Sequence, residues 1–428
     1  MDYKVIIIQI SNLAWEILKT WWWLPLPVIL FFPLRFFYLW YVNNKYWGRI
    51  QWVNLELRTP KDVERPLKAM DQVMTNFWTL YDPADFKETW VEGKFLLPFF
   101  LEIAGIDGNV HFFLRIPKSM RTVFESAIYS QYPDVEVTEV EDYIKRVPQN
   151  IPNEEWDMWG CNFKITQKEK GGQCYPIKTY ASFFEPTQEV KEEKRIDPLS
   201  VLIEGMSRLK KGEQLWFQMR LTPVPKTEWY DECKTLVNKL VQRPEPPKDK
   251  SITASAIDVL AHGIMPYEKK KEEPSAAVPL EMRITPGERD FVSAIENKMA
   301  HAGFRSNLRM IYLGKKDAFF KPNLKLILNF SVGISTQNLN GLMPAQTTKV
   351  VAPYPFRERK LYMKKKVMFR RYSKRWIPNY PFDGGTYILT PEEVATLYHF
   401  PSKVGAPTPT FSRIESKKSG PPPSLPIE

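Results

Sequence analysis

The alternation of hydrophobic and polar positions predicts a first α+β unit over residues 50–147. Apolar side chains alternate with polar ones over 51–58 and 135–141, and two further strands are expected at 94–106 and 109–116. That period is typical of half-buried strands. Helical spacing follows Thr59-Pro60 and Ser119, which are expected to cap two helices, and Asp107-Gly108 predicts a tight hairpin. The order β-α-β-β-α-β is that of a ferredoxin-like unit.

A similar order recurs over residues 156–352 and predicts a second ferredoxin-like unit. Alternating apolar positions occupy four segments: 161–165, 215–221, 280–284 and 308–312. Asp197-Pro198 and Thr285-Pro286 are typical helix starts. Residues 223–278 lie between the two central strands, so we expect an insertion with one or two helices there. A further helix over 317–331 is expected to pack on the outside.

Residues 21–42 predict a transmembrane segment, because 18 of the 22 are apolar, ten are aromatic and Arg35 is the single charge. A helix of that length spans about 33 Å, close to the ~30 Å of bilayer hydrocarbon. Aromatic side chains at both ends are the expected membrane-interface residues: Trp21, Trp22, Trp23, Tyr38, Trp40 and Tyr41. One span and surface anchoring both remain open, and a core helix of a soluble protein is the alternative.

The segment before this run, Val5–Thr20, has polar and apolar side chains on opposite helical faces and predicts an amphipathic interfacial helix. Residues 1–48 as a whole are therefore expected to anchor the chain to a membrane. Lys45 and Arg49 follow the apolar run, which favours a cytoplasmic carboxyl side. We expect a location at the inner, cytoplasmic membrane, with the soluble part in the cytoplasm.

The composition is that of a globular protein, with 43% hydrophobic and 25% charged residues, and it excludes a wholly disordered chain. The net charge of +11 lies at the two ends. Residues 1–50 carry +3, residues 353–428 carry +8, and the part between them is neutral. If the central part of the chain bound nucleic acid, we would expect the excess positive charge to lie there. Only the two basic ends therefore suggest contact with nucleic acid.

Residues 357–375 contain ten Lys and Arg with one acidic residue, interleaved with aromatic residues and methionines. Such a stretch can hold phosphate backbones, lie on an anionic membrane leaflet, or form a charged margin of a domain. The candidate contacts for nucleic acid or lipid are Lys364, Lys365, Lys366, Arg370, Arg371, Lys374 and Arg375. The region 353–400 ends in a short helix opened by Thr390-Pro391, and the Pro-rich residues 401–428 predict an extended tail.

No pattern for catalysis, a metal or a cofactor is present in the sequence. Three cysteines and four histidines lack zinc-site spacing, and the sparse, odd cysteine count argues against a disulfide framework and suits a reducing compartment. The sequence also lacks a phosphate loop and a nucleophile elbow. His111 is expected on the polar side of a hairpin, and Glu139, Glu141 and Asp142 are expected at a solvated sheet edge. The sequence therefore predicts neither an enzyme nor a cofactor.

Several strings resemble a poorly characterised bacterial family of membrane-anchored regions associated with the motor ATPases of type IV secretion and conjugation-type DNA transfer. The strings are RTPKDVERPLKAMDQV, ESAIYSQYPDVEVTEVEDY, EKRIDPLSVLIEGMSRLKKGEQLWFQ, TQNLNGLMP and YILTPEEVATLYHFP. In longer relatives a phosphate-loop ATPase would follow the last string. This chain stops at Glu428, so the resemblance implies a non-enzymatic adaptor that docks a separately encoded motor ATPase.

The alternative function is that of a stand-alone, membrane-associated protein that binds nucleic acid through residues 357–375. An ATPase gene immediately downstream would favour the adaptor, and an isolated gene would favour the alternative. The identity of the partner, the transported substrate and the oligomeric state remain open.

Overall fold

The computed structural model describes residues 15–16, 19–20, 25–59, 67–167, 171–180, 197–241, 285–350 and 356–401. The described part is mixed α and β, as predicted. The chain divides into two compact units. The smaller unit combines Met1–Gln51 with Asp82–Leu97, and the larger unit combines Trp52–Tyr81 with Pro98–Glu428.

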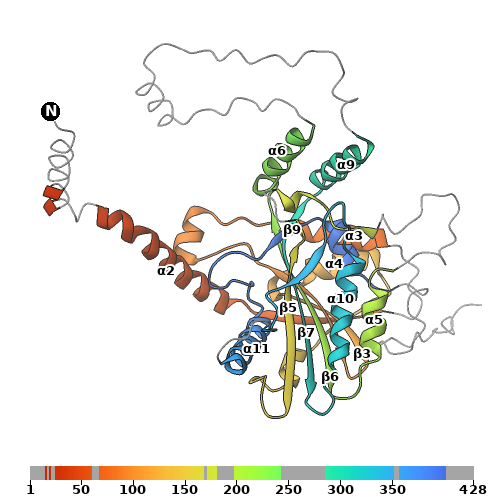
Figure 1. The fold of residues 1–428 in the computed structure, drawn as a ribbon. Helices are drawn as coiled ribbons and strands as arrows, with labels where there is room; N and C mark the ends of the chain where they lie inside the picture. The colour runs from red at the N-terminus through yellow and green to blue at the C-terminus, as the bar shows by residue number, and fades with distance from the viewer. Residues whose placement is uncertain are drawn as a thin grey trace, which may run out of the picture. The chain divides into compact units, whose positions relative to one another are not determined.

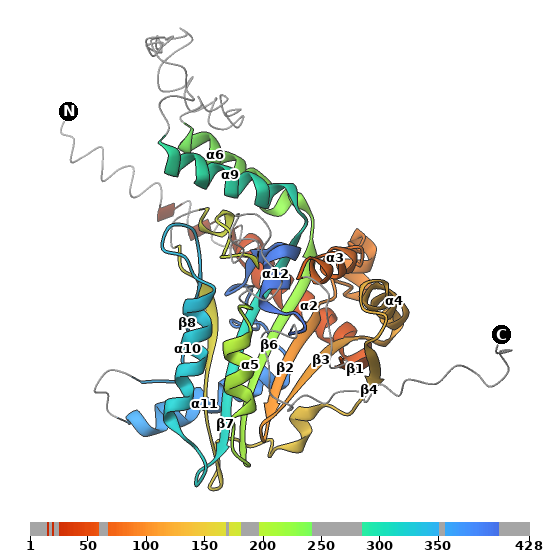
Figure 2. The ribbon, with the colours of Figure 1, turned by 90° about the vertical axis from the view of Figure 1, so that its right-hand side faces the viewer.

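The larger unit is built on one antiparallel sheet, which contains nine strands of the described residues (Figures 1 and 2). The strands are β1 Trp52–Arg58, β2 Phe99–Ile106, β3 Asn109–Pro117, β4 Glu136–Glu139, β5 Trp156–Ile165, β6 Glu213–Val224, β7 Gly303–Lys315, β8 Leu342–Ala345 and β9 Tyr387–Leu389. Their order is β4-β1-β3-β2-β6-β7-β5-β8, and β9 pairs with the start of β7. The hairpin at Asp107-Gly108 has positive φ at both residues, as a tight turn requires.

The two predicted units are joined within this sheet, because β2 pairs with β6 along its whole length. Ile103 lies opposite Phe217 at the middle of the pairing. The apolar side chains of both halves form one cluster. Alternation along a strand identifies its buried face, but it does not identify the strand that lies next to it.

Five helices cover one face of the sheet, which we call the first face (Figure 2). They are α3 Leu67–Trp78, α4 Arg121–Gln131, α5 Ser200–Ser207, α10 Leu324–Gly333 and α12 Pro391–Leu397. The predicted strand faces are confirmed, since the alternating apolar positions of β1, β3, β6 and β7 are buried beneath these helices. The predicted cap of α4 was wrong: Ser119 lies within the short 3-10 turn Lys118–Met120 that precedes the helix and makes no cap.

The helix expected on the outside is α10, and it packs on the first face beside α5. Its Ile327 and Phe330 are buried, and Gly205 of α5 leaves room for Leu326, whose Cδ2 would lie 2.5 Å from an added Cβ. The predicted helix α9, Pro286–Ala300, instead packs against α6, Tyr230–Leu240 (Figures 1 and 2). The predicted strand 280–284, most of the predicted insertion 223–278 and most of the tail lie outside the described residues.

A separate apolar cluster holds α6 and α9, and it contains a disulfide between Cys174 and Cys233. Trp229 and Ile295 are fully buried in this cluster. The expectation that the cysteines form no disulfide is therefore wrong for this pair, while Cys161 is a buried thiol. The two paired cysteines are 59 residues apart in the sequence. No local sequence pattern indicates that they lie next to each other in the fold.

In the smaller unit, α2 spans Pro25–Arg49, and a single π-helical turn, η1, spans Glu88–Glu92. By length and hydropathy, none of the helices in the described residues qualifies as a membrane span. Of the predicted interface residues, Tyr38, Trp40 and Tyr41 are exposed on α2, whereas Trp21, Trp22 and Trp23 lie outside the described residues. The predicted amphipathic helix Val5–Thr20 lies mostly outside them as well. The strand predicted to start at Lys94 begins only at Phe99, because Lys94 belongs to the smaller unit.

Candidate functional site

The basic stretch forms helix α11, Arg357–Ser373, on the second face of the sheet (Figure 1). Three apolar side chains at helical spacing, Met368, Phe369 and Tyr372, are buried against the sheet. Gly160 of β5 makes this approach possible, since an added Cβ would lie 3.1 Å from Met368 Cγ. These aromatic residues and methionine therefore fix the helix to the body of the protein and are not free to stack on bases.

Arg375, just beyond α11, is buried in a network of ion pairs. Its guanidinium donates to both carboxylate oxygens of Glu102 at 2.7 and 2.9 Å, and to those of Asp142 at 2.7 and 3.1 Å. Its side chain is 3% exposed. The prediction that Arg375 contacts nucleic acid or lipid is therefore wrong, because its donors are used inside the protein. Sequence position alone cannot distinguish a basic residue that folds inward from its exposed neighbours.

Asp142 is the second carboxylate of this network, and Arg115 Nη1 also donates to it at 2.8 Å. Burial by itself would raise the pKa of Asp142, but the charges of Arg375 and Arg115 outweigh this effect and hold the pKa below its usual range. The expectation of a solvated sheet edge is thus wrong for Asp142. Glu139 and Glu141 do lie at the surface, where they pair with Arg121 and Lys145.

Arg309 is a further buried cation on the second face, and the sequence analysis missed it. Nε donates to Asn162 Oδ1 at 2.7 Å, and Nη2 donates to the backbone carbonyl of Trp376 at 3.0 Å. Burial lowers the pKa of Arg309 to about 9. The available signal was a single arginine within the otherwise apolar strand 308–313, because a charge there must be paired or bonded inside the fold.

His111, Glu56 and Arg58 form another polar group on this face. His111 Nδ1 lies 2.7 Å from Glu56 Oε1, and Arg58 Nη2 lies 2.9 Å from Glu56 Oε2. Burial tends to raise the pKa of Glu56, but the hydrogen bonds and charges of these two partners lower it to about 2. His111 lies on the opposite side of β3 from the buried Val110 and Phe112, as expected.

Four exposed cations on the outward side of α11 make no ion pair with the carboxylates of the described residues. Lys364, Lys366, Arg370 and Lys374 are exposed. Lys364 Nζ donates to the backbone carbonyl of Lys349 at 3.2 Å, and Lys366 and Arg370 lie over the rings of Tyr362 and Trp376. Exposed Arg357, Arg359 and Lys360 extend the same side toward the start of the helix. We call these seven residues the outer face of α11.

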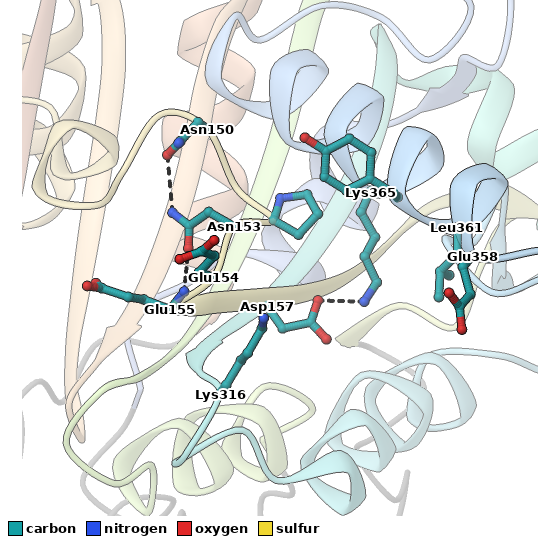
Figure 3. A pocket seen from close by; sticks show the side chains of 11 residues that line it. Asn150, Asn153, Glu154, Glu155, Asp157, Lys316, Glu358, Leu361 and Lys365 are labelled. Carbon is teal, nitrogen blue, oxygen red and sulfur yellow. Dashed lines mark hydrogen bonds and ion pairs between the residues drawn. The ribbon is translucent and has the colours of Figure 1, made fainter.

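Lys365 and Arg371 are the two remaining candidates, and neither is fully exposed. Lys365 Nζ pairs with Asp157 Oδ1 at 2.5 Å, which joins α11 to β5 (Figure 3). Arg371 is half-buried, and burial lowers its pKa. Four of the seven predicted contacts are therefore presented together on the outer face.

A pocket of about 850 Å³ opens beside the first turns of α11 (Figure 3). It is lined by Asn150, Pro152, Asn153, Glu154, Glu155, Asp157, Lys316, Glu358, Leu361, Tyr362 and Lys365. Asn153 fixes one wall, because its Oδ1 accepts from the backbone of Glu155 and Trp156. The Lys365–Asp157 pair lies in the lining, so it turns this cation toward the pocket and away from the outer face. The described residues contain no cluster of His, Cys, Asp and Glu suited to a metal ion.

Residues 100–409 match the model of the family described as "Domain of unknown function (DUF8128)". The chain belongs to the DUF8128 family. The DUF8128 region begins within β2 and runs beyond α12, so it includes α11, the pocket and the ion-pair network. It leaves out α2, β1, α3 and the segment 82–97. A search of curated proteins finds no match to the chain.

Proposed function

We propose that this DUF8128 protein is a non-enzymatic adaptor whose outer face of α11 binds the phosphate backbone of nucleic acid. The observation that carries the proposal is the grouping of seven exposed cations on one side of a helix whose other side is fixed to the sheet. When a rigid cationic surface of this kind neutralises phosphates, the nucleic acid releases the counterions condensed on it. Contacts of this kind position a backbone without reading its sequence.

The resemblance noted above supports a place for this adaptor in a type IV secretion or conjugation-like DNA-transfer apparatus. There it would dock a separately encoded motor ATPase and bring nucleic acid near it. The stand-alone nucleic-acid-binding protein is the second candidate, and it uses the same outer face. The two differ in one respect: only the adaptor requires the ATPase for its role, so co-purification of an ATPase from native membranes distinguishes them.

We also propose that α2 holds the protein at the cytoplasmic membrane. Large apolar side chains of this helix are exposed in the structure: Leu26, Ile29, Leu30, Phe31, Phe32, Leu34, Phe37, Tyr38, Trp40 and Tyr41. Lys45 and Arg49 follow them, and both would face anionic headgroups. Burying these side chains in lipid removes apolar surface from water, at roughly 25 cal/mol per Å².

We further propose that each half of the sheet is a ferredoxin-like unit. The first half runs β1-α3-β2-β3-α4-β4, with the strand order β4-β1-β3-β2. The second half runs β5-α5-β6-β7-α10-β8, with α6 and α9 between β6 and β7, and its order is β8-β5-β7-β6. The two orders correspond strand for strand, and the halves meet through the equivalent strands β2 and β6. This correspondence supports an internal duplication.

The test of the nucleic-acid role replaces Lys364, Lys366, Arg370 and Lys374 with Gln. We expect binding of duplex DNA to weaken, and the slope of log affinity against log salt to flatten by about 0.9 for each phosphate that the variant no longer neutralises. A matched control replaces four exposed lysines elsewhere, Lys118, Lys210, Lys211 and Lys325, which changes the net charge by the same amount. Equal weakening in both variants, or weaker binding to anionic vesicles with no DNA binding by either protein, would overturn the proposal.

A further inference from the structure

Residues 82–97 pack against α2, although they follow α3 in the sequence. Trp90 is the main contact: its ring stacks on Tyr38 with 6.2 Å between ring centroids, and Arg35 Cζ lies 5.6 Å from its centroid. Tyr38 Oη also donates to the backbone carbonyl of Trp90 at 2.8 Å. These contacts fix the segment at the middle of α2.

A second set of contacts fixes the end of the segment farther along α2. Phe95 packs between Tyr46 and Trp47, with centroid distances of 5.8 and 6.0 Å. Gly93 has φ +74°, and an added Cβ would lie 2.3 Å from the carbonyl oxygen of Val42, so only glycine allows this approach. The segment is therefore a folded part of the smaller unit.

Two large apolar side chains of this segment nevertheless point to solvent. Phe86 is 79% exposed and Val91 is 66% exposed, on either side of the well-packed Trp90. They add to the exposed apolar side chains of α2, so the smaller unit presents many large apolar side chains to solvent. Surfaces of this kind on folded proteins mark contacts with partners or with membranes.

We propose that residues 82–97 are a second membrane-contacting segment, in which Phe86 and Val91 insert into an anionic bilayer beside α2. The inference rests on the proposed membrane association of α2 and deepens it. The segment meets α2 near Tyr38, where aromatic rings and Arg35 are suited to the level of the headgroups. Phe86 and Val91 would then lie at the boundary between headgroups and acyl chains.

The arrangement of side chains on α2 favours lipid over a protein partner. Four consecutive residues, 29–32, are exposed and apolar, and successive residues of a helix point about 100° apart. Their apolar surface therefore surrounds the helix, whereas a protein groove would cover one stripe.

Charge also favours an anionic bilayer. The described α2 carries Arg35, Lys45 and Arg49 with no acidic residue. Of the acidic residues in segment 82–97, Asp82 and Glu88 are paired with Lys94 at 3.0 and 3.1 Å, which reduces their repulsion of anionic headgroups.

The experiment attaches an environment-sensitive fluorophore, NBD, to a cysteine introduced into the full chain as Phe86→Cys. Labelling without reductant preserves the disulfide, and the buried thiol of Cys161 has a pKa raised by burial, so the native cysteines react little. Phe37→Cys reports on α2, and Phe320→Cys, on an exposed site of the larger unit, is the matched control. The probe is vesicles of phosphatidylcholine and phosphatidylserine.

We expect blue-shifted, brighter emission at positions 86 and 37 and no change at 320. A response at 37 with none at 86 would overturn the role of the segment and leave the membrane role of α2 standing. Unchanged emission at both positions would overturn both proposals. Because a label can disturb packing, Phe86→Ser with Val91→Ser gives a second measurement: vesicle affinity should fall roughly ten-fold or more, and Phe320→Ser should leave it unchanged.

Discussion

Helices α3, α4, α5 and α10 on the first face and α11 on the second face are held to the sheet by different physical means. On the first face, α3, α4, α5 and α10 pack through one large apolar cluster. On the second face, α11 packs through a smaller apolar cluster, and the chain just after it is joined to the sheet by the ion pairs of Arg375 with Glu102 and Asp142. Apolar packing tolerates small shifts, whereas hydrogen-bonded charges demand one geometry.

The difference suggests why the second face carries the candidate site. A buried ion pair is weak evidence for stability, since its desolvation offsets much of the attraction. Its directionality instead favours one position and one rotation of the helix. For α11, that rotation turns the cations of the outer face toward solvent and the apolar side chains toward the sheet. We therefore interpret the network as the element that positions the binding surface.

The largest expected effect comes from breaking this network with Arg375→Met. The change leaves Glu102 and Asp142 buried without their partner, so the free energy of unfolding should fall by about 3–5 kcal/mol. Leu101→Ala, which opens a cavity on the first face, should cost about 2–5 kcal/mol. Urea unfolding measures both.

The two faces should then differ in whether the free-energy cost of a second substitution simply adds to that of Arg375→Met. Glu102→Gln should cost much less in the Arg375→Met background than in the natural chain, because its charge no longer has a partner. Leu101→Ala on the other face should cost the same in both backgrounds. Full additivity of Glu102→Gln with Arg375→Met would show that the network does not act as a unit.

The next effect is the response to acid, to which Glu56 and Asp142 on the second face should contribute. The folded-state pKa of Glu56 is lowered from 4.5 to about 2, so its stabilising contribution is present above pH 4.5 and is lost as the pH falls toward about 2. Asp142, with its pKa also lowered, acts in the same direction. Stability measured by urea unfolding should therefore decline across this window.

Two variants sharpen this acid response. His111→Gln removes a partner that lowers the pKa of Glu56, so the decline should become shallower. Leu101→Ala should lower the whole curve without changing its shape, because no titrating group is affected. A decline of the same steepness in His111→Gln would contradict the assignment to Glu56.

The smallest effect on stability is expected on the outer face of α11. Replacing Lys364, Lys366, Arg370 and Lys374 with Gln removes exposed charges that pair with no carboxylate of the described residues, so each should change the free energy of unfolding by about 0.5 kcal/mol or less. Thermal unfolding of this variant should nearly match that of the natural protein. A large drop in stability would mean that these cations serve the fold.

Local patterns were sufficient to predict much of the first face. Period-2 alternation placed the buried positions of β1, β3 and β6, and Thr390-Pro391 marked the start of α12, where Thr390 and Glu393 form a capping box. These features depend on residues a few positions apart. The basic character of this region was equally visible, because the ten Lys and Arg of residues 357–375 lie together.

Features that depend on distant residues were not predictable in this way. The joining of β2 to β6, the burial of Arg375 by Glu102 and the Cys174–Cys233 disulfide each connect positions far apart in the chain. The packing of segment 82–97 on α2 is of the same kind. The sequence gives the residue type at each position, but the fold determines which distant residue it contacts.

The most direct test of the central claim is a photo-crosslinking measurement at the middle of the outer face. A benzophenone amino acid replaces Met363, which is exposed among the cations of α11, and a second protein carries it at Phe320 as the control. Our account predicts crosslinks to duplex DNA at 363 and none at 320, with the yield falling steeply between about 50 and 200 mM salt. Crosslinking at neither position, or equal and salt-independent crosslinking at both, would contradict the claim that this face binds nucleic acid.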